Sequence, residues 1–365
     1  MKKKKIGILT FQRTVNYGAQ FQNFALQEYL NSYKDLDVEV INYENDQVNK
    51  IEKRATFFEQ KNIKDIIKYL KNGHSKNKRW DRFEEFRNEY INLSKYYDKH
   101  NINEVNRIYD YFVVGSDQVW NTIITDNDTN YYLDFVVDDS KKFSYAASIG
   151  NNDIFLKDNS EFINLLKKFQ KINVREESAK KILEKNKLNN IDVVVDPTFL
   201  MTKDEWINKL DLKKEKDKYI LVYMIDNART NMKKIRELAK REKLEIIYIN
   251  NNFFNELGIN NNRTASPVQF LNYLYNSKYV VTGSFHAICL SIIFNKNFYY
   301  ILNKKIDRNS RITDLIQKLN IKDNDITDSV HINLCNIDYN IVNELIKKEI
   351  EKSKKIIENM IKNWE

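Results

Sequence analysis

The stretch KYVVTGSFHAICLSIIFN, residues 278–295, carries both a clear fold signal and the most unusual histidine of the chain. Its first part, YVV, is rich in β-branched and aromatic residues and predicts a short strand. A turn at residues 282–284 follows, and an apolar run with helical spacing begins around His286. One of only four histidines in 365 residues therefore lies where a strand passes into a helix.

The same alternation of strand and helix recurs along the whole chain. In the first part, a helix is expected at 19–33, and the expected strands are 4–10, 38–43, 109–116, 142–148, 171–174 and 191–195. In the second part, helices from Pro267 and over 310–319 alternate with expected strands at 219–225, 244–250, 279–282 and 298–302. Two such series predict two Rossmann-like, doubly wound α/β domains that face a cleft.

Three segments interrupt or end this alternation. Residues 50 to about 95 are charged and helix-like, and they predict a helical insertion in the first domain. The charged hexamer 213–218 is the expected boundary, giving domains at 1–212 and 213–335 and a C-terminal helix at 336–365. This helix has an apolar stripe, so we expect it to pack back on the body and to cross to the first domain. The alternative is a peripheral membrane contact through its lysines.

Composition narrows the classes of partner. Lys and Arg number 60 against 51 Asp and Glu, a formal charge of +9, which favours anionic partners such as phosphates or acidic glycans. No arginine-rich arm, zinc knuckle or aromatic RNA-binding strand is present, so no nucleic acid is expected. The two cysteines, Cys289 and Cys335, cannot make a disulfide framework, and no apolar run is long enough to span a membrane. We expect a soluble, cytoplasmic protein.

The position of His286 points to an anionic ligand. If Ser284 caps the helix, His286 lies in its first turn, beside backbone N–H groups without intrahelical partners. The positive end of a helix favours a phosphate or carboxylate, and a neutral imidazole there can exchange a proton near pH 7. The alternative is a partly buried histidine whose ring nitrogens are satisfied by nearby backbone.

Arg175 also lies at an unusual place, because it follows the expected strand 171–174 and opens the helix REESAKKIL. A cation opposes the helix dipole there, which makes sense if the guanidinium faces an anion in the cleft. The alternative is a salt bridge to Asp196 or Glu176, worth little if it is exposed.

Two further turns present polar side chains after a strand. FVVGSDQVWN, residues 112–121, repeats the strand-turn pattern of the second domain: Asp117 caps a helix or binds a hydroxyl-rich ligand, and Trp120 stacks on a sugar or packs in the core. VNYGA, residues 15–19, is a tight turn before a helix. No Walker loop, GxGxxG motif, metal-spaced His/Cys cluster or Ser-His-Asp set accompanies them, so neither a metal nor an organic cofactor is expected.

Together these segments resemble the polysaccharide pyruvyl transferase family. The resemblance covers nearly the whole chain and is carried, in order, by NYGAQFQNFALQEYL, FVVGSDQVWN, SYAASIG, VREESAKKIL, VVDPTFLM, YVVTGSFHAICLSIIFNKNFYYI and NSRITDL. It implies a fold like that of GT-B glycosyltransferases, with the donor held mainly by the second domain. It also implies the reaction: phosphoenolpyruvate gives its pyruvyl carbon to two hydroxyls of one sugar in a cell-surface polysaccharide or lipid-linked precursor, with loss of phosphate.

The resemblance also implies roles for single residues. His286 matches the family's proposed catalytic acid/base residue, and Arg175 matches an arginine proposed to bind phosphoenolpyruvate. Some members carry an arginine where this chain has Ser284, and either Arg308 or Arg311 is expected to replace it. The turn residues Gly283, Ser284 and Phe285 then lie beside the donor. The expected acceptor side is made of Asn16, Tyr17, Gly18, Ser116, Asp117 and Trp120.

Two other functions remain open from the sequence. A GT-B glycosyltransferase with a nucleotide-sugar donor would be protected by a nucleoside diphosphate rather than by phosphoenolpyruvate. A non-catalytic glycan-binding or assembly protein would keep the scaffold and would tolerate the loss of the His286 side chain.

Overall fold

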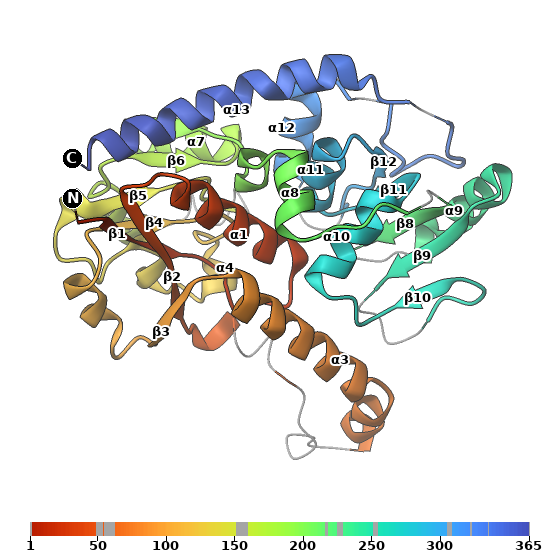
Figure 1. The fold of residues 1–365 in the computed structure, drawn as a ribbon, viewed down its shortest axis with the longest axis horizontal. Helices are drawn as coiled ribbons and strands as arrows, with labels where there is room; N and C mark the ends of the chain where they lie inside the picture. The colour runs from red at the N-terminus through yellow and green to blue at the C-terminus, as the bar shows by residue number, and fades with distance from the viewer. Residues whose placement is uncertain are drawn as a thin grey trace.

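In a computed structural model, the protein consists of two α/β halves joined side by side (Figure 1). The structure describes residues 2–48, 54, 63–150, 160–215, 218–224, 229–250, 255–304, 309–321, 323–334 and 336–364. Arg308 and Cys335, both named above, lie outside these residues.

The first half is built on a parallel sheet with the strand order β3-β2-β1-β4-β5. These strands are β1 (Lys4–Leu9), β2 (Leu36–Tyr43), β3 (Leu93–Tyr97), β4 (Tyr111–Val114) and β5 (Lys142–Ser144). Isolated bridges continue the sheet from β5 to a parallel pair, β6 (Ile172–Val174) and β7 (Ile191–Val193). The strands β1 and β4 are buried almost throughout, as expected for parallel strands covered on both faces.

The second half repeats this plan in a parallel sheet with the order β10-β9-β8-β11-β12. Its strands are β8 (Tyr219–Tyr223), β9 (Glu245–Ile249), β10 (Asn260–Asn262), β11 (Tyr279–Thr282) and β12 (Asn297–Tyr300). In both sheets the order runs 3-2-1-4-5, the order of a Rossmann fold, with the switch point between the first and fourth strands. Two Rossmann-like halves in a GT-B-like pair are therefore confirmed.

Helices cover the sheets and supply the turns that face the cleft. In the first half they are α1 (Tyr17–Asn31), α3 (Ile63–Tyr90), α4 (Thr122–Thr125), α6 (Ser160–Leu166), α7 (Glu177–Lys185), the short η5 (Pro197–Leu200) and α8 (Lys203–Lys209). In the second half they are α9 (Arg229–Glu242), α10 (Pro267–Asn276), α11 (Phe285–Ile293) and α12 (Ser310–Lys318), and the chain closes with α13 (Tyr339–Lys362).

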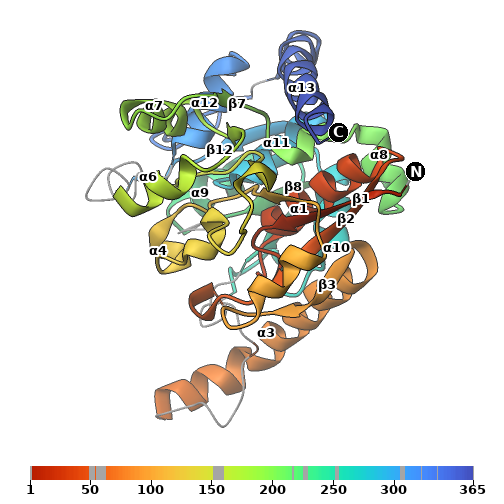
Figure 2. The ribbon, with the colours of Figure 1, turned by 90° about the vertical axis from the view of Figure 1, so that its left-hand side faces the viewer.

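The segment expected as a helical insertion is only partly helical. The long helix α3 confirms its central portion, and Figures 1 and 2 show this helix extending away from the body. Residues 93–97, however, form β3, an edge strand paired with β2. The prediction was wrong there because LSKYY is polar, and its short, mostly open strand lacks an apolar alternation. The three-residue strand β10 was missed for the same reason.

The C-terminal helix α13 crosses from the second half to the first, where the chain ends beside β4 and β5 (Figure 1). Its apolar residues Val342, Ile346, Ile357 and Met360 are buried on the body. The apolar face is thus covered by the body, as expected, while lysines of the same helix such as Lys347 and Lys348 stay exposed. No helix among the described residues is long and apolar enough to cross a membrane.

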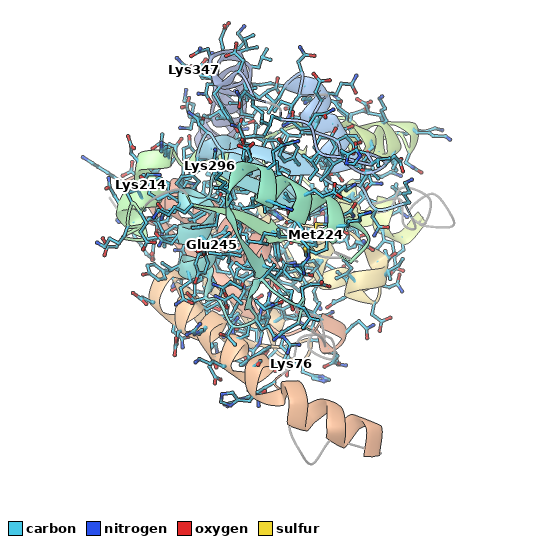
Figure 3. All side chains as sticks on the ribbon, turned by 90° about the vertical axis from the view of Figure 1, so that its right-hand side faces the viewer. Lys76, Lys214, Met224, Glu245, Lys296 and Lys347 are labelled. Carbon is cyan, nitrogen blue, oxygen red and sulfur yellow. The ribbon has the colours of Figure 1, made fainter. Side chains whose placement is uncertain are left out.

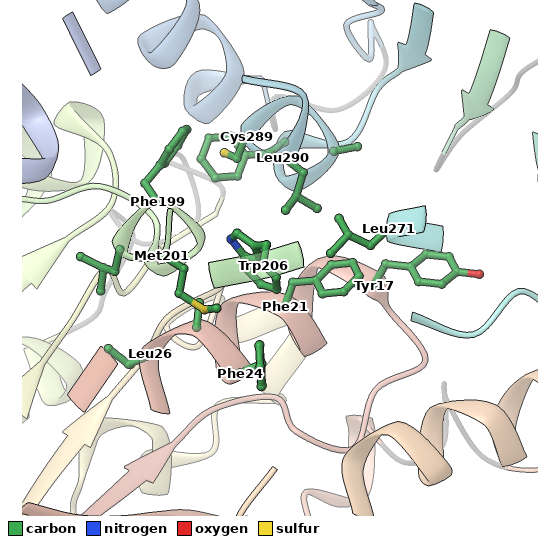
Figure 4. Close-up of a cluster of buried hydrophobic side chains, with 14 of the residues drawn as sticks. Tyr17, Phe21, Phe24, Leu26, Phe199, Met201, Trp206, Leu271, Cys289 and Leu290 are labelled. Atoms are coloured by element: carbon green, nitrogen blue, oxygen red, sulfur yellow. The ribbon is translucent and has the colours of Figure 1, made fainter. Parts of the chain in front are cut away.

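The two halves share one hydrophobic core rather than touching at a polar seam. Tyr17 of α1 stacks on Phe270 of α10 with ring centroids 4.3 Å apart, and its hydroxyl donates to the carbonyl of Ala265. Figure 4 shows Trp206 of α8 beside Phe21 of α1 at the centre of this cluster, and the two rings make an edge contact at 5.7 Å. Such buried aromatic contacts fix how the two sheets face each other.

The basic excess is spread over the surface. Figure 3 shows Lys76 on α3, Lys214 before β8 and Lys347 on α13 at separate places on one view of the molecule, and all three side chains are exposed.

Candidate active site

A cavity of about 440 Å³ lies between the two halves, at the carboxyl ends of their strands. Several residues expected at the site line it: Asn16, Asp117, Gly283, Ser284, Phe285, His286 and Arg311. They come from turns that follow β1, β4, β11 and β12. Open α/β sheets bind ligands at this edge, next to their switch points.

Three helices begin at this cavity. The residues that precede their first turns, Asn16 of α1, Ser284 of α11 and Asn309 of α12, all line it. The first amides of a helix lack intrahelical partners, and its amino end carries a partial positive charge. Three such ends at one cavity produce a positive field suited to an anion with more than one charged group.

His286 lies in the first turn of α11, as expected. The hydroxyl of Ser284 caps the helix by accepting from the amide of Ala287 at 3.4 Å. The imidazole is largely buried, and its Nδ1 side packs against Gly18 of α1, where an added Cβ would lie only 2.1 Å from Nδ1. The histidine of the second half therefore contacts the first half, where the absence of a side chain at Gly18 leaves space for the ring.

Arg175 lies behind the histidine rather than on the cavity wall. It precedes Glu176, the N-cap of α7, so the helix begins two residues later than the sequence suggested. Its side chain is only 1% exposed, and its Nη1 donates to Asp196 Oδ2 at 2.9 Å. The same nitrogen lies 3.1 Å from His286 Nε2. The salt bridge to Asp196 raised as an alternative thus exists, but it is buried.

Asp117 is the second carboxylate on Arg175. Its Oδ1 lies 3.4 Å from Arg175 Nη2 and accepts from the amide of Gln118 at 2.9 Å. Burial alone would raise the pKa of Asp117, but the positive charge of Arg175, with smaller effects from its neighbours, lowers it. Asp117 is therefore an ionised group on the cavity wall, where it can accept a hydrogen bond from a hydroxyl.

Asp196 is the functional candidate that sequence reasoning named only as a possible partner of Arg175. Its side chain is fully buried, and Oδ2 lies 3.3 Å from His286 Nε2. Burial opposes its ionisation, yet the charge and hydrogen bond at His286, together with Arg175, hold its pKa well below the usual range. The available signal was its place directly after the expected strand 191–195, at the same sheet edge as Arg175.

Arg311 presents its guanidinium at the cavity. It lies in the first turn of α12, and with the oxygen of the Gln118 amide turned toward it, that oxygen accepts from Nη2 at 2.7 Å and Nη1 at 3.1 Å. The guanidinium carbons of Arg311 and Arg175 lie 5.8 and 4.9 Å from the ring centroid of Phe285. Phe285 thus holds two cations near His286 through contacts with its ring.

Four residues expected on the acceptor side do not line the cavity. Trp120 is fully buried, donates its indole N–H to the carbonyl of Tyr131 and stacks on Tyr132. The prediction that Trp120 stacks on a sugar is therefore wrong, and the alternative of core packing holds. Ser116 is also fully buried and donates to the carbonyl of Ala146. In each case the side chain meets a partner in the protein interior.

The other two, Tyr17 and Gly18, begin α1 at the contact between the halves. Tyr17 is 1% exposed and packs in the core that joins the halves, which leaves no surface for a ligand. Gly18 is buried against the ring of His286. Asn16 stays at the cavity and accepts from the amides of Gly18 and Ala19.

Within the described parts of the chain, no group of three or more His, Cys, Asp or Glu side chains is placed to hold a metal ion. At the cavity, His286 instead lies beside Arg311 and three helix ends, and the buried pair of Asp196 and Arg175 supports its ring from behind. This set suits an anionic substrate that must accept or release a proton.

The sequence model of polysaccharide pyruvyl transferases matches residues 16–305, which is most of the chain. The chain belongs to the polysaccharide pyruvyl transferase family. It is therefore a pyruvyltransferase, and membership implies a sugar or glycan acceptor. The matched region contains Asp117, Arg175, Asp196 and His286.

Solved structures with a similar course of the chain include UDP-GlcNAc 2-epimerases. The enzyme from Neisseria meningitidis bound to UDP-GlcNAc aligns with a TM-score of 0.49 and 12% identity over 98% of this chain and 100% of that chain. The enzyme from Methanocaldococcus jannaschii, in complex with UDP-GlcNAc and UDP, aligns with a TM-score of 0.47 and 13% identity over 95% of this chain and 92% of that chain. At this level of likeness nothing follows about substrate. No curated protein sequence matches the chain.

Proposed function

We propose that the protein transfers the pyruvyl group of phosphoenolpyruvate to two hydroxyls of one sugar, in a cell-surface polysaccharide or its precursor. The product is a cyclic pyruvate ketal, and inorganic phosphate is released. The observation that carries this proposal is the convergence of three helix amino ends and Arg311 on the cavity that contains His286.

The donor suits this cavity because it carries two anionic groups, a phosphate and a carboxylate. A helix amino end binds either group through backbone N–H donors, and a guanidinium binds either in bidentate fashion. Arg311, at the start of α12, lines the same cavity as Ser284 and His286 at the start of α11. We assign Arg311 to the place of the arginine that some family members carry at the position of Ser284.

The chemistry requires one proton at carbon and one departing phosphate. His286 in its protonated form gives a proton to C3 of phosphoenolpyruvate, which becomes a methyl group and leaves C2 electrophilic. The first sugar hydroxyl adds to C2 and returns its proton to His286. The C2–O bond to phosphate then breaks, phosphate leaves with the electron pair, and the second hydroxyl bonds to C2 while its proton passes to the phosphate.

The cations beside the cavity act on the phosphate as it leaves. Arg311 and the amides that begin α11 and α12 stabilise negative charge that grows on the phosphate oxygens. Arg175 lies behind His286, where its guanidinium is shared between the carboxylates of Asp196 and Asp117. Direct contact of Arg175 with the donor requires Asp117 to release Nη2.

The acceptor enters from the first half of the molecule in this scheme. Asn16 and Asp117 line the cavity from the loops after β1 and β4. An ionised carboxylate and an amide are suitable partners for sugar hydroxyls, and Asp117 Oδ1 is already oriented by the amide of Gln118. These two residues take over the acceptor role from the buried Trp120 and Tyr17.

The test compares ligands by thermal unfolding and then by turnover. A ligand that binds only the native state adds about 2.7 kcal/mol at 100-fold over its Kd, so phosphoenolpyruvate should raise Tm and UDP should not. With a glycan acceptor, phosphate should be released, and the product should carry a new methyl singlet in its proton NMR spectrum.

Other outcomes would identify a different function. A rise in Tm with UDP alone would favour a nucleotide-sugar glycosyltransferase. Glycan binding without phosphate release, unchanged in His286→Ala, would indicate a binding protein that keeps the scaffold.

A further inference from the structure

The carboxylate of Asp196 is held by four contacts that use both of its oxygens. Oδ1 accepts from the amide and the hydroxyl of Thr198 at 3.0 and 2.8 Å, which caps η5. Oδ2 accepts from Arg175 Nη1 at 2.9 Å and lies 3.3 Å from His286 Nε2. With its side chain fully buried, Asp196 has no freedom to turn away from the imidazole. Capping η5 requires Oδ1 alone, so the placement of Oδ2 needs a separate explanation.

The charged and titratable groups around His286 come from several neighbouring elements. Asp117 follows β4, Arg175 follows β6, Asp196 follows β7 and Arg311 begins α12. One turn along α11, burial raises the pKa of the Cys289 thiol well above its usual range, so it stays neutral. From α1 the ring packs against the uncharged Gly18.

Of these groups, Asp196 and Arg175 approach Nε2 within hydrogen-bond reach. Arginine has no acceptor atom, so of the two groups near Nε2 in the described part of the chain, Asp196 Oδ2 is the one that can accept its proton. The Nδ1 edge of the ring faces the opposite way, toward Gly18 at the start of α1, and the neighbours Asn16 and Ala19 line the cavity. The two ring nitrogens therefore have different surroundings: Nε2 lies beside a buried carboxylate, and Nδ1 lies against Gly18, between two residues that line the cavity.

We propose that Asp196 is a positioning residue that keeps the proton on Nε2 of His286, so that Nδ1 is the nitrogen that exchanges a proton with the substrate. The buried carboxylate fixes the tautomer of the neutral ring and stabilises the imidazolium that protonates C3. Arg175 balances the charge of Asp196 when the imidazole is neutral. The catalytic part of this assignment rests on the proposed function, in which His286 is the acid.

The tautomer can be measured on the wild-type protein without any substrate. Long-range ¹H–¹⁵N correlation spectra distinguish protonated from unprotonated ring nitrogens, and the His286 signals are identified by their loss in His286→Gln. Above the pH at which the ring becomes neutral, Nε2 should read as protonated and Nδ1 as unprotonated. The reverse pattern, in which Arg175 Nη1 donates to Nε2, would overturn the assignment.

Kinetics of Asp196→Asn give the second readout. General acid–base catalysis contributes about 10²- to 10⁴-fold, so kcat should fall within that range while the KM for phosphoenolpyruvate changes little. The alkaline limb of the kcat profile should move to lower pH, because the carboxylate that stabilises the imidazolium is gone. A merely structural role would lower the amount of folded enzyme and leave this limb in place.

Asp128→Asn is the matched control, because Asp128 is a partly buried carboxylate that accepts from Tyr43 and Asn45 away from His286. It should leave kcat, the pH profile and the His286 spectrum unchanged. If phosphoenolpyruvate supports no turnover in the wild type, the proposed function fails, while the spectrum still decides the role of Asp196. An Asp196→Asn enzyme with wild-type kcat and pH profile would refute the positioning role.

Discussion

Gly18 and His286 lie in direct contact across the two halves of the molecule, and a Cβ atom on Gly18 would lie 2.1 Å from Nδ1 and 2.5 Å from Cγ of the ring. The contact joins the first turn of α1 to the first turn of α11. A glycine is therefore required here by the space that the imidazole occupies, and its role is distinct from the turn that the sequence indicated.

Gly18→Ala should displace the imidazole from Asp196 and lower kcat sharply. The added methyl group also overpacks the contact, at a cost of about 1–3 kcal/mol in the free energy of unfolding. Steady-state kinetics and urea unfolding measure the two effects separately.

Gly258→Ala is the control for this substitution. Its nearest neighbour is 3.7 Å from an added Cβ, so only the positive φ of 69° makes the change unfavourable. It should lose some stability and keep kcat. Equal kcat in both variants would show that the contact with His286 has no catalytic importance.

Arg311→Ala should weaken binding of the donor more than it slows chemistry. Hydrogen bonds to charged groups contribute about 1.5–3 kcal/mol, so KM for phosphoenolpyruvate should rise roughly 10- to 150-fold. Arg311→Lys should recover only part of this loss, because an ammonium group cannot bind an anion in bidentate fashion.

Arg107→Ala controls for the change in net charge, since Arg107 is an exposed cation at the end of the short helix Ile102–Arg107 and does not line the cavity. Its KM should match the wild type. If Arg311→Ala also has a wild-type KM, another group holds the donor, and the replacement for the missing arginine must be sought elsewhere.

The buried carboxylate of Asp196 should make stability depend on pH in a defined direction. Its pKa is lowered in the folded protein, so its contribution is complete above the unfolded value of about 3.9 and is lost as the pH falls below it. Breaking a buried ion pair costs about 3–5 kcal/mol, so Asp196→Asn should be that much less stable at pH 7. The gap between the two proteins should shrink below about pH 4.

Glu176→Gln should show the opposite dependence. Burial raises the pKa of Glu176 despite the charge of Arg175. The contribution of this residue to the free energy of unfolding is therefore largest at low pH and is lost as the pH rises through its folded pKa. Urea unfolding at a series of pH values from 3 to 8, run on both variants, measures the two trends. Parallel trends would contradict the assignment of opposite shifts.

How much of this site the sequence could reveal depends on the range of the contacts involved. His286, Ser284 and Gly283 were recognisable because a strand, a turn and a helix start within a few residues, and that local pattern fixes their exposure to the cavity. The pairing of His286 with Asp196 joins the end of β7 to the start of α11, and no local pattern reports such a contact.

Trp120 shows the same limit from the other side. It follows a strand and a Gly-Ser turn as His286 does, yet the loop at Tyr131 and Tyr132 covers it and takes its indole N–H. Whether a turn residue is exposed to the cavity thus depends on a later segment of the chain that packs over the turn. The polar edge strand β3 was missed for an analogous reason, since its pairing with β2 does not depend on an apolar alternation.

Trp364 should be the residue through which α13 stabilises the first half. Its side chain is fully buried, its ring stacks on Tyr111 with centroids 5.1 Å apart, and its carbonyl accepts from the Tyr111 hydroxyl at 2.9 Å. Trp→Ala changes in a core cost about 3–5 kcal/mol, so Trp364→Ala should lower the free energy of unfolding by that amount. Urea unfolding at pH 7 is the measurement.

Ile341→Ala, on the same helix, is the matched control because Ile341 is 53% exposed, and its removal should change stability by less than about 0.5 kcal/mol. Ser353 of α13 also accepts from the amide of Val195, next to Asp196. Loosening α13 should therefore raise the proteolytic sensitivity of the segment that carries Asp196. A Trp364→Ala protein as stable as Ile341→Ala would mean that the helix contributes nothing to the site through this end.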